Sequence, residues 1–287
     1  MNNQPTLKKI FRFPLKKITI GILVVGGSVA LGEMLSRPLL DTIKIIGEPA
    51  NAVVAIVDVS LALLSYVLLF SVYEKRKITE LSVTAFLKNA VIGFSAGIFL
   101  QSLFIFIIYL AAGYSITATN PVSFLLPAFT IAFTAGFVAE LLLRGIIFRL
   151  TEEKLGTEIA LLMMMLFFVI MHSGSKNANL LSVLATSIQA GLLLSAAYVF
   201  TRTLWYSIFL HFAWDFAEPG IFGAINPGNK VEASLFSSKI TGPELLTGGL
   251  NGPGNSIQSI ICCLTAALLL LWLAERKNNF IKPYWKR

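Results

Sequence analysis

The feature that most constrains this chain is a series of apolar blocks separated by short charged segments. Blocks such as LALLSYVLLF and CLTAALLLLWLA carry no charged side chain. A helix of about 20 apolar residues spans the hydrocarbon core of a bilayer. Only 13% of the 287 residues are charged, whereas a soluble domain carries about 25%. The sequence therefore predicts an all-α integral membrane protein.

We expect a bundle of about eight transmembrane helices that encloses an intramembrane polar cavity. The predicted spans are residues 18–40, 50–73, 88–113, 121–149, 157–174, 180–200, 204–222 and 256–274. They divide the chain into five parts: a basic N-terminal segment (1–17), three helices (18–120), a four-helix core (121–222), a Gly- and Pro-rich loop (223–255), and a last helix with a basic tail (256–287). The first span also resembles a signal peptide. We interpret it as retained, because its apolar run continues past Glu33.

The basic residues predict the orientation of the bundle. With eight spans, the basic N-terminus, residues 74–77, residues 149–154, Arg202 and the C-terminal tail all fall on one side. Because basic loops stay in the cytoplasm, both termini are predicted to be cytoplasmic and the loop 223–255 extracytoplasmic. The net charge of +8 comes from these short segments between apolar blocks, so it does not indicate a nucleic-acid partner.

Five ionisable residues inside the apolar blocks are candidates for function. Both histidines of the chain, His172 and His211, lie in such blocks. Asp215 follows His211 by four residues, and Arg144 follows Glu140 by four, so each pair shares one helix face. At about 1.5 Å per residue, Glu140, His172, His211 and Asp215 fall roughly 10–22 Å from the predicted cytoplasmic ends of their helices. They can therefore occupy one layer. Ionisable groups in hydrocarbon are costly, and this favours a functional role.

Structural roles remain open for the same residues. Glu140 and Arg144 can form an ion pair that only joins helices, and His172 can be a hydrogen-bonded core residue. The pair of His211 and Asp215 is equally compatible with a structural contact.

Three further acids lie nearer the predicted outer face. We interpret Glu33 and Asp58 as structural. Glu218 shares the helix face of His211 but borders the outer loop, so we expect its carboxylate to be solvated.

Three short motifs follow one another in the core. They are AELLLRG at residues 139–145, FVIMH at 168–172 and HFAWD at 211–215. Their order resembles the CPBP intramembrane proteases, a family that includes the type II CAAX prenyl endopeptidases. That family carries E-E-x-x-x-R, then F-x-x-x-H, then H-x-x-x-N or H-x-x-x-D. The resemblance covers about residues 121–222, which would be the catalytic core.

The resemblance implies an endopeptidase that cleaves a membrane-anchored peptide or a prenylated protein in contact with membrane lipid, in a bacterial cell membrane. In the family the first glutamate activates water with help from the histidine of the second motif, here His172. His211 and Asp215 would hold the developing oxyanion, while Glu140 and Arg144 would shape the site. This metal-free mechanism requires no cofactor, and we prefer it. Zinc is an alternative, with Glu140, His172 and His211 as its ligands.

The chain departs from the family at residue 139. The spacing to Arg144 matches Glu140 to the second glutamate, so Ala139 occupies the position of the expected base. Alanine cannot accept a proton. Either the residue was replaced to silence the enzyme, or the chain is a natural degenerate member. A base role for Glu140 would need its helix to turn by about 100°.

Three hypotheses on function follow. The first is an intramembrane endopeptidase, and the second is a catalytically silent relative that binds membrane segments in an immunity, chaperone or regulatory role. The third, a small-molecule transporter, is disfavoured by the order of the motifs and by the lack of an internal repeat.

Overall fold

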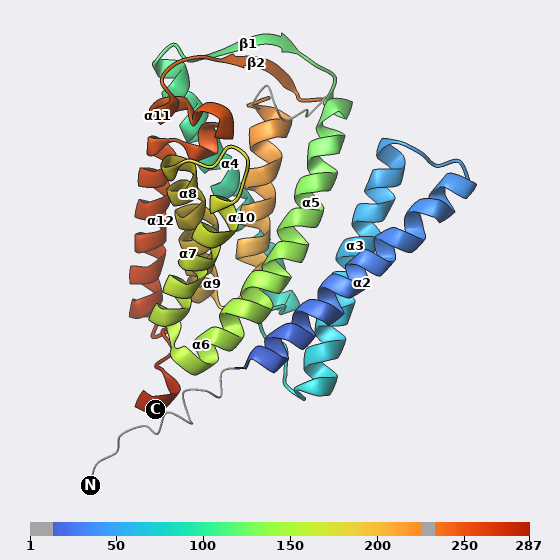
Figure 1. Ribbon diagram of the computed structural model, residues 1–287, viewed down its shortest axis with the longest axis vertical. Coiled ribbons are helices and arrows are strands. Elements are labelled where there is room, and N and C mark those ends of the chain that lie inside the picture. The colour runs from blue at the N-terminus through green and yellow to red at the C-terminus, as the bar shows by residue number, and fades with distance from the viewer. Residues whose placement is uncertain (1–13, 225–232) are drawn as a thin grey trace.

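The computed structural model describes residues 14–224 and 233–287, and 77% of the protein is helical. Part of the predicted N-terminal segment, with Lys8, Lys9 and Arg12, lies outside the described residues, as does part of the predicted loop 223–255. The helices run side by side between two ends of the molecule (Figure 1). One end carries the C-terminus and a short helix, α6 (Arg149–Leu155), and the other carries a pair of strands.

A helical hairpin forms one flank of the bundle. It consists of α2 (Leu15–Thr42) and α3 (Glu48–Leu68), which a π-helical turn extends to Tyr73. Gly47 has a positive φ of 68° and allows the tight reversal between the two helices. Pro49 then occupies the first turn of α3, where a proline costs no hydrogen bond. In Figure 1 the two helices lie apart from the rest of the bundle at the strand end.

The centre of the bundle is α10 (Leu204–Phe216), continued by a π-helical turn to Ile221. It packs against α4 (Phe86–Leu110) and α5 (Leu126–Glu140). Glycines allow the close approach: a Cβ on Gly93 would lie 2.4 Å from the carbonyl oxygen of Tyr206, and a Cβ on Gly136 would lie 3.0 Å from Phe212. Small residues at helix contacts are typical of membrane proteins, because helix association there depends on close packing.

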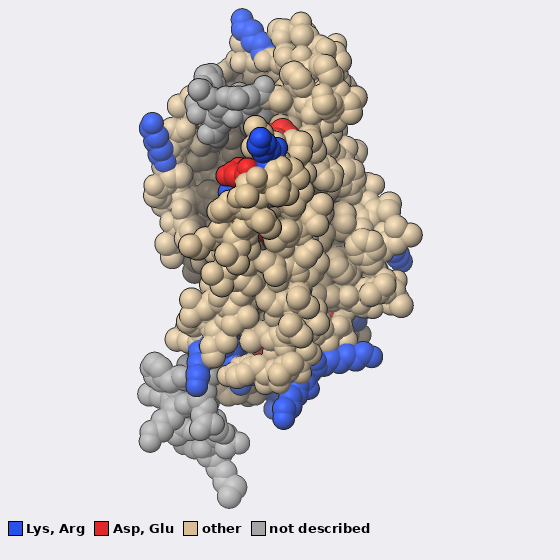
Figure 2. All heavy atoms as spheres, turned by 90° about the vertical axis from the view of Figure 1, so that its right-hand side faces the viewer, with Lys and Arg blue, Asp and Glu red and all other residues tan. Residues whose placement is uncertain are grey.

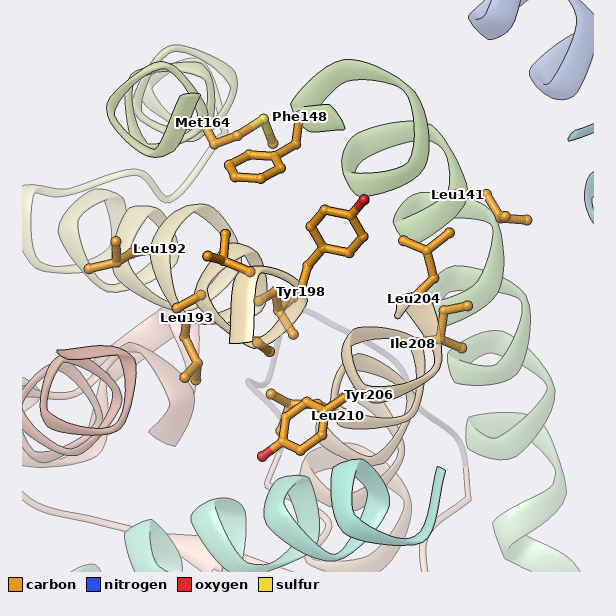
Figure 3. Packing of buried hydrophobic residues seen from close by; sticks show 14 of the residues in the cluster. Leu141, Phe148, Met164, Leu192, Leu193, Tyr198, Leu204, Tyr206, Ile208 and Leu210 are labelled. Atoms are coloured by element: carbon orange, nitrogen blue, oxygen red, sulfur yellow. The ribbon is translucent and has the colours of Figure 1, made fainter. Parts of the chain in front are cut away.

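The remaining helices close the other side of α10. They are α7 (Thr157–Ser173), α8 (Leu180–Thr186) with a π-helical stretch (Ser187–Leu193), α9 (Leu194–Thr201), and α12 (Ile257–Arg276). Phe148, Met164 and Tyr198 come from three different helices and meet in the core between them (Figure 3). This contiguous core determines how α5 to α10 are placed around the polar residues.

The helical content agrees with the predicted all-α membrane fold, and two short strands that the sequence did not predict lie at the end of the bundle. β1 (Tyr114–Thr119) and β2 (Phe236–Ile240) pair antiparallel, with Tyr114 opposite Ile240. The two segments have 6 and 5 residues, which is too short for their residue pattern to predict a strand. The pairing joins segments more than a hundred residues apart, and a local pattern carries no information on such a contact. The loop after β2 continues as α11 (Glu244–Thr247) and two 3-10 turns, Gly249–Asn251 and Pro253–Asn255.

Several helices are suited to a bilayer. Among the described residues, six are long and apolar enough to span it: Leu15–Thr42, Glu48–Tyr73, Val83–Leu110, Val122–Leu155, Leu180–Thr201 and Ile257–Arg276. α7 is apolar but has 17 residues, and the segment around α10 is not among the six. Figure 2 shows the α2–α3 side of the molecule, where the middle is almost entirely tan. The protein is an integral membrane protein, and the count of eight spans stays a prediction.

Buried ion pairs organise the end of the bundle that carries the C-terminus. Glu152 is 1% exposed and lies 2.6 Å from a guanidinium nitrogen of Arg202. Glu80, which precedes α4, accepts a hydrogen bond of 2.6 Å from the hydroxyl of Tyr66 and is also paired with Arg76. In this way Glu80 and Arg202, which lie in the connections between helices, are bound to Tyr66 and Glu152 on the helices.

Candidate active site

A cavity of about 340 Å³ lies between α5, α7, α10 and the π-helical stretch that precedes α9. Four of the predicted site residues line it: Ala139, His172, His211 and Asp215. Apolar side chains such as Leu143 and Phe168 form much of the remaining wall. His172 and Asp215 each lie close to the end of their helix that is nearer the strands, so the cavity is in that half of the bundle.

Glu140 and Arg144 lie behind this cavity rather than in its wall. Both side chains are 0% exposed, and Nη1 of Arg144 donates to Oε1 of Glu140 at 2.8 Å. The guanidinium also lies 5.7 Å from the centre of the Phe168 ring, on its face. A π-helical stretch, Leu141–Phe148, follows Glu140 directly. Such stretches are rare and occur frequently at functional sites.

His211 connects the buried pair to the cavity. Its Nδ1 lies 2.9 Å from Oε1 of Glu140, and its Nε2 lies 3.3 Å from Oδ2 of Asp215. Oε1 of Glu140 therefore accepts hydrogen bonds from both His211 and Arg144. A ring with protons on both nitrogens satisfies both carboxylates. The predicted i,i+4 pairs thus form one chain of contacts, Asp215–His211–Glu140–Arg144, across α10 and α5.

His172 stands apart from that chain but faces the same cavity. Its Nδ1 lies 3.3 Å from the carbonyl oxygen of Phe168, one turn earlier on α7. A proton on Nδ1 makes this hydrogen bond and leaves Nε2 as an acceptor, for which the described residues provide no donor. The structure brings Glu140, Arg144, His211 and Asp215 together by direct contact, and Ala139 and His172 join them by lining the cavity.

A family model described as type II CAAX prenyl endopeptidase Rce1-like matches residues 121–217. Over these residues the chain is similar to the CPBP/CAAX protease family. The matched segment contains all six predicted site residues and runs from just before the 3-10 turn that precedes α5 to the first residue after α10. No curated protein and no solved structure matches the chain.

In the structure, the zinc ligands considered from the sequence do not come together within residues 121–217. In the part of the chain that the structure describes, no three His, Cys, Asp or Glu side chains are placed to hold a metal ion. Oε1 of Glu140 already receives Arg144 and His211, and His172 lies outside that group. These residues do not fit a zinc site with Glu140, His172 and His211 as ligands.

Further residues of the site were missed in the sequence. Thr186, Gln189 and Trp214 also line the cavity. The amide nitrogen of Gln189 donates to the carbonyl of Gly254 and lies 3.0 Å from Oγ of Ser259, so it joins the cavity wall to the loop after β2. No motif marks these residues, because an uncharged side chain in an apolar block has no distinctive signature.

The expectation of a solvated Glu218 is wrong. One carboxylate oxygen accepts a hydrogen bond of 2.9 Å from Gln101, and the other accepts one of 3.1 Å from the backbone of Gly254. Gly252 has a φ of 80°, and a Cβ there would lie 2.6 Å from Oε1 of Glu218. The Gly- and Pro-rich loop therefore folds back onto the end of α10, and Glu218 fastens it there.

Proposed function

We propose that this chain is an intramembrane endopeptidase of the CPBP/CAAX type, acting on a peptide bond of a membrane-anchored peptide or prenylated protein. One observation carries the proposal: Ala139, His172, His211 and Asp215, which come from three separate helices, line one cavity. The cavity is largely apolar with a few polar groups, the usual character of a small binding site.

Peptide hydrolysis needs a group that accepts a proton from water and donors for the oxyanion. In this proposal Nε2 of His172 assists the water, because its Nδ1 is engaged by Phe168. His211 faces the same space, and the N–H of its Nε2, which also contacts Asp215 at 3.3 Å, supplies a donor for the oxyanion. Glu140 holds Nδ1 of His211 at 2.9 Å and so determines the orientation of the ring. Arg144 keeps Glu140 in place.

Ala139 supports a second candidate function. Its methyl group lines the cavity at the position of the family's base, and Asp215 is the one carboxylate in the cavity wall within the described residues. Asp215 is 3.3 Å from His211 and so is partly engaged. A chain that keeps the cavity but lacks the base would bind membrane segments without cutting them, as a silent relative in an immunity, chaperone or regulatory role.

The test compares the chain with Ala139→Glu in a cleavage assay on membrane-embedded reporter peptides. Because a general base contributes about 10²–10⁴-fold to rate, Ala139→Glu should raise cleavage by that factor. Ala139→Gln is the matched control, since it has nearly the same size but cannot accept the proton. Adding His172→Ala to Ala139→Glu should abolish the gain.

Each outcome decides between the candidates. Peptide binding by all variants with no cleavage even by Ala139→Glu would favour the silent relative. Rapid cleavage by the unmodified chain that His172→Ala leaves unchanged would contradict both roles assigned to this cavity.

A further inference from the structure

A second polar cavity, of about 510 Å³, lies between α2, α3 and α5. It belongs to the flank of the bundle and is lined by none of the residues of the candidate active site. The polar side chains in its wall are Glu33, Arg37, Glu48, Asn51, Asp58 and Thr130. Figure 2 looks onto this side and shows acidic and basic side chains close together beside a hollow.

The spacing of these residues places them on shared helix faces. Glu48, Asn51 and Asp58 follow one another at intervals of three and seven, which is one face of α3. Glu33 and Arg37 are four apart on α2. The rest of both helices is apolar and largely exposed, as with Leu35 at 70%. Two membrane helices thus turn polar faces toward the same space.

The cavity wall contains three carboxylates, those of Glu33, Glu48 and Asp58, but one basic side chain, that of Arg37. Arg37 donates to Glu33 at 3.0 Å and to Asn51 at 3.3 Å, and Asn51 donates in turn to Glu48 at 3.4 Å. Arg37 therefore balances the charge of Glu33. The carboxylates of Glu48 and Asp58 have no basic partner among the residues that the structure describes.

Asp58 is the strongest indication of a ligand. The residue is 5% exposed, it lines the cavity, and its Oδ1 has no hydrogen-bond partner within the described residues. A buried carboxylate only accepts hydrogen bonds, so it requires a donor. Leaving such a group without a partner in a membrane protein is costly, and this points to a cationic ligand.

A metal ion fits this arrangement poorly. No three acidic side chains in the described ranges are close enough to hold one. Glu48 and Asp58 are ten residues apart on α3, which is about 15 Å along a helix, whereas cations such as Ca²⁺ need six or more oxygens within about 2.6 Å.

An ammonium group fits better. It carries three donors, so one carboxylate and one or two hydroxyl or carbonyl oxygens satisfy it. The hydroxyl of Thr130 donates to the carbonyl of Pro127 at 2.9 Å. Within the described residues this hydroxyl oxygen accepts no hydrogen bond, so it can accept one in the cavity wall. The volume of about 510 Å³ exceeds what a single ion needs and suits an organic amine.

We propose that the cavity between α2, α3 and α5 binds an ammonium group, which pairs with Asp58. The amine comes either from a free polyamine or from the headgroup of an aminophospholipid. Both sources present the same chemistry to Asp58, and neither involves the candidate active site.

The first experiment measures binding of spermidine to the purified full chain in neutral detergent by isothermal titration calorimetry at fixed ionic strength. The chain should bind saturably, whereas 1,4-butanediol, which lacks the charge, should not bind. Asp58→Asn should weaken spermidine binding about 10- to 100-fold, the usual contribution of a charge-assisted hydrogen bond. Asp41→Asn is the matched control: it makes the same change at an exposed site on α2 and should leave the affinity unchanged.

The second experiment compares thermal stability in phosphatidylglycerol nanodiscs with and without phosphatidylethanolamine. A gain in Tm from phosphatidylethanolamine that Asp58→Asn removes and Asp41→Asn retains would assign the site to a lipid headgroup. Spermidine binding without that gain would assign it to a free amine. Circular dichroism checks that each variant is folded. If neither amine acts, or if folded Asp58→Asn responds like the unmodified chain, the proposal is wrong.

Discussion

Replacing Glu140 by leucine should destabilise the protein strongly, because it leaves Arg144 as a buried unpaired cation. Both side chains are 0% exposed and 2.8 Å apart. Nε and Nη2 of Arg144 have no hydrogen-bond partner in the described part of the chain, so Glu140 satisfies the guanidinium almost alone. Breaking a buried pair by removing one partner costs about 3–5 kcal/mol. This lowers the ratio of folded to unfolded protein by roughly two to three and a half powers of ten.

The double variant Glu140→Leu/Arg144→Met should recover part of that loss. Removing both charges eliminates the unpaired cation, and apolar replacements of buried pairs are often neutral or stabilising. One cost remains, because Nδ1 of His211 loses the acceptor that lies 2.9 Å away. A buried donor without an acceptor costs about 1–3 kcal/mol. We therefore expect the double variant to be destabilised by about that amount.

The assay is reversible unfolding in mixed micelles, followed by circular dichroism. The matched control is Glu33→Leu, which breaks a pair with the same spacing whose side chains are 49% and 50% exposed. An exposed pair contributes about 0–1 kcal/mol. If Glu140→Leu costs no more than Glu33→Leu, or if the double variant is no more stable than the single one, the reasoning about the buried charge is wrong.

Two further predictions concern the ion pairs at the C-terminal end of the bundle. Arg202→Ala should cost about 2–3 kcal/mol in the same unfolding assay, because it leaves the buried carboxylate of Glu152 without its cationic partner. The expected cost is at or below the low end for buried pairs, since the side chain of Arg202 is 27% exposed. A loss of stability below about 1 kcal/mol would contradict this prediction. Burial alone would raise the pKa of Glu80, but hydrogen bonds from Arg76 and Tyr66 lower that pKa below the ordinary 4.5. The stabilisation from Glu80 should therefore be complete above pH 4.5 and lost as the pH falls through the lower folded value. Unfolding measured against pH should lose part of this acid dependence in Glu80→Gln, and an unchanged profile would refute the assignment.

Much of this protein could be predicted from local patterns alone. Apolar blocks identify membrane helices, because a helix satisfies its own backbone hydrogen bonds and the bilayer permits few alternatives. The spacing of Glu140 to Arg144 and of His211 to Asp215 predicts shared helix faces for the same local reason. The three motifs in order resemble the CPBP proteases, and a family model of that kind matches the same segment, residues 121–217.

Only the tertiary structure decided which of these groups share a cavity. Ala139 and Glu140 are neighbours in sequence, yet one lines the cavity and the other is buried behind it with Arg144. That outcome depends on how α5 is rotated against α7 and α10, which packing between helices determines.

The contacts of the loop and the pairing of the strands could likewise not be predicted from the sequence. Glu218 binds Gly254 because a loop folds back over α10, and β1 pairs with a strand more than a hundred residues away. Asp58 carries no mark in the sequence that distinguishes a paired acid from an unpaired one. The contact of Glu218 with Gly254 and the pairing of β1 with β2 join segments that are distant in the chain, so their energies depend on the folded arrangement and not on the local residue pattern.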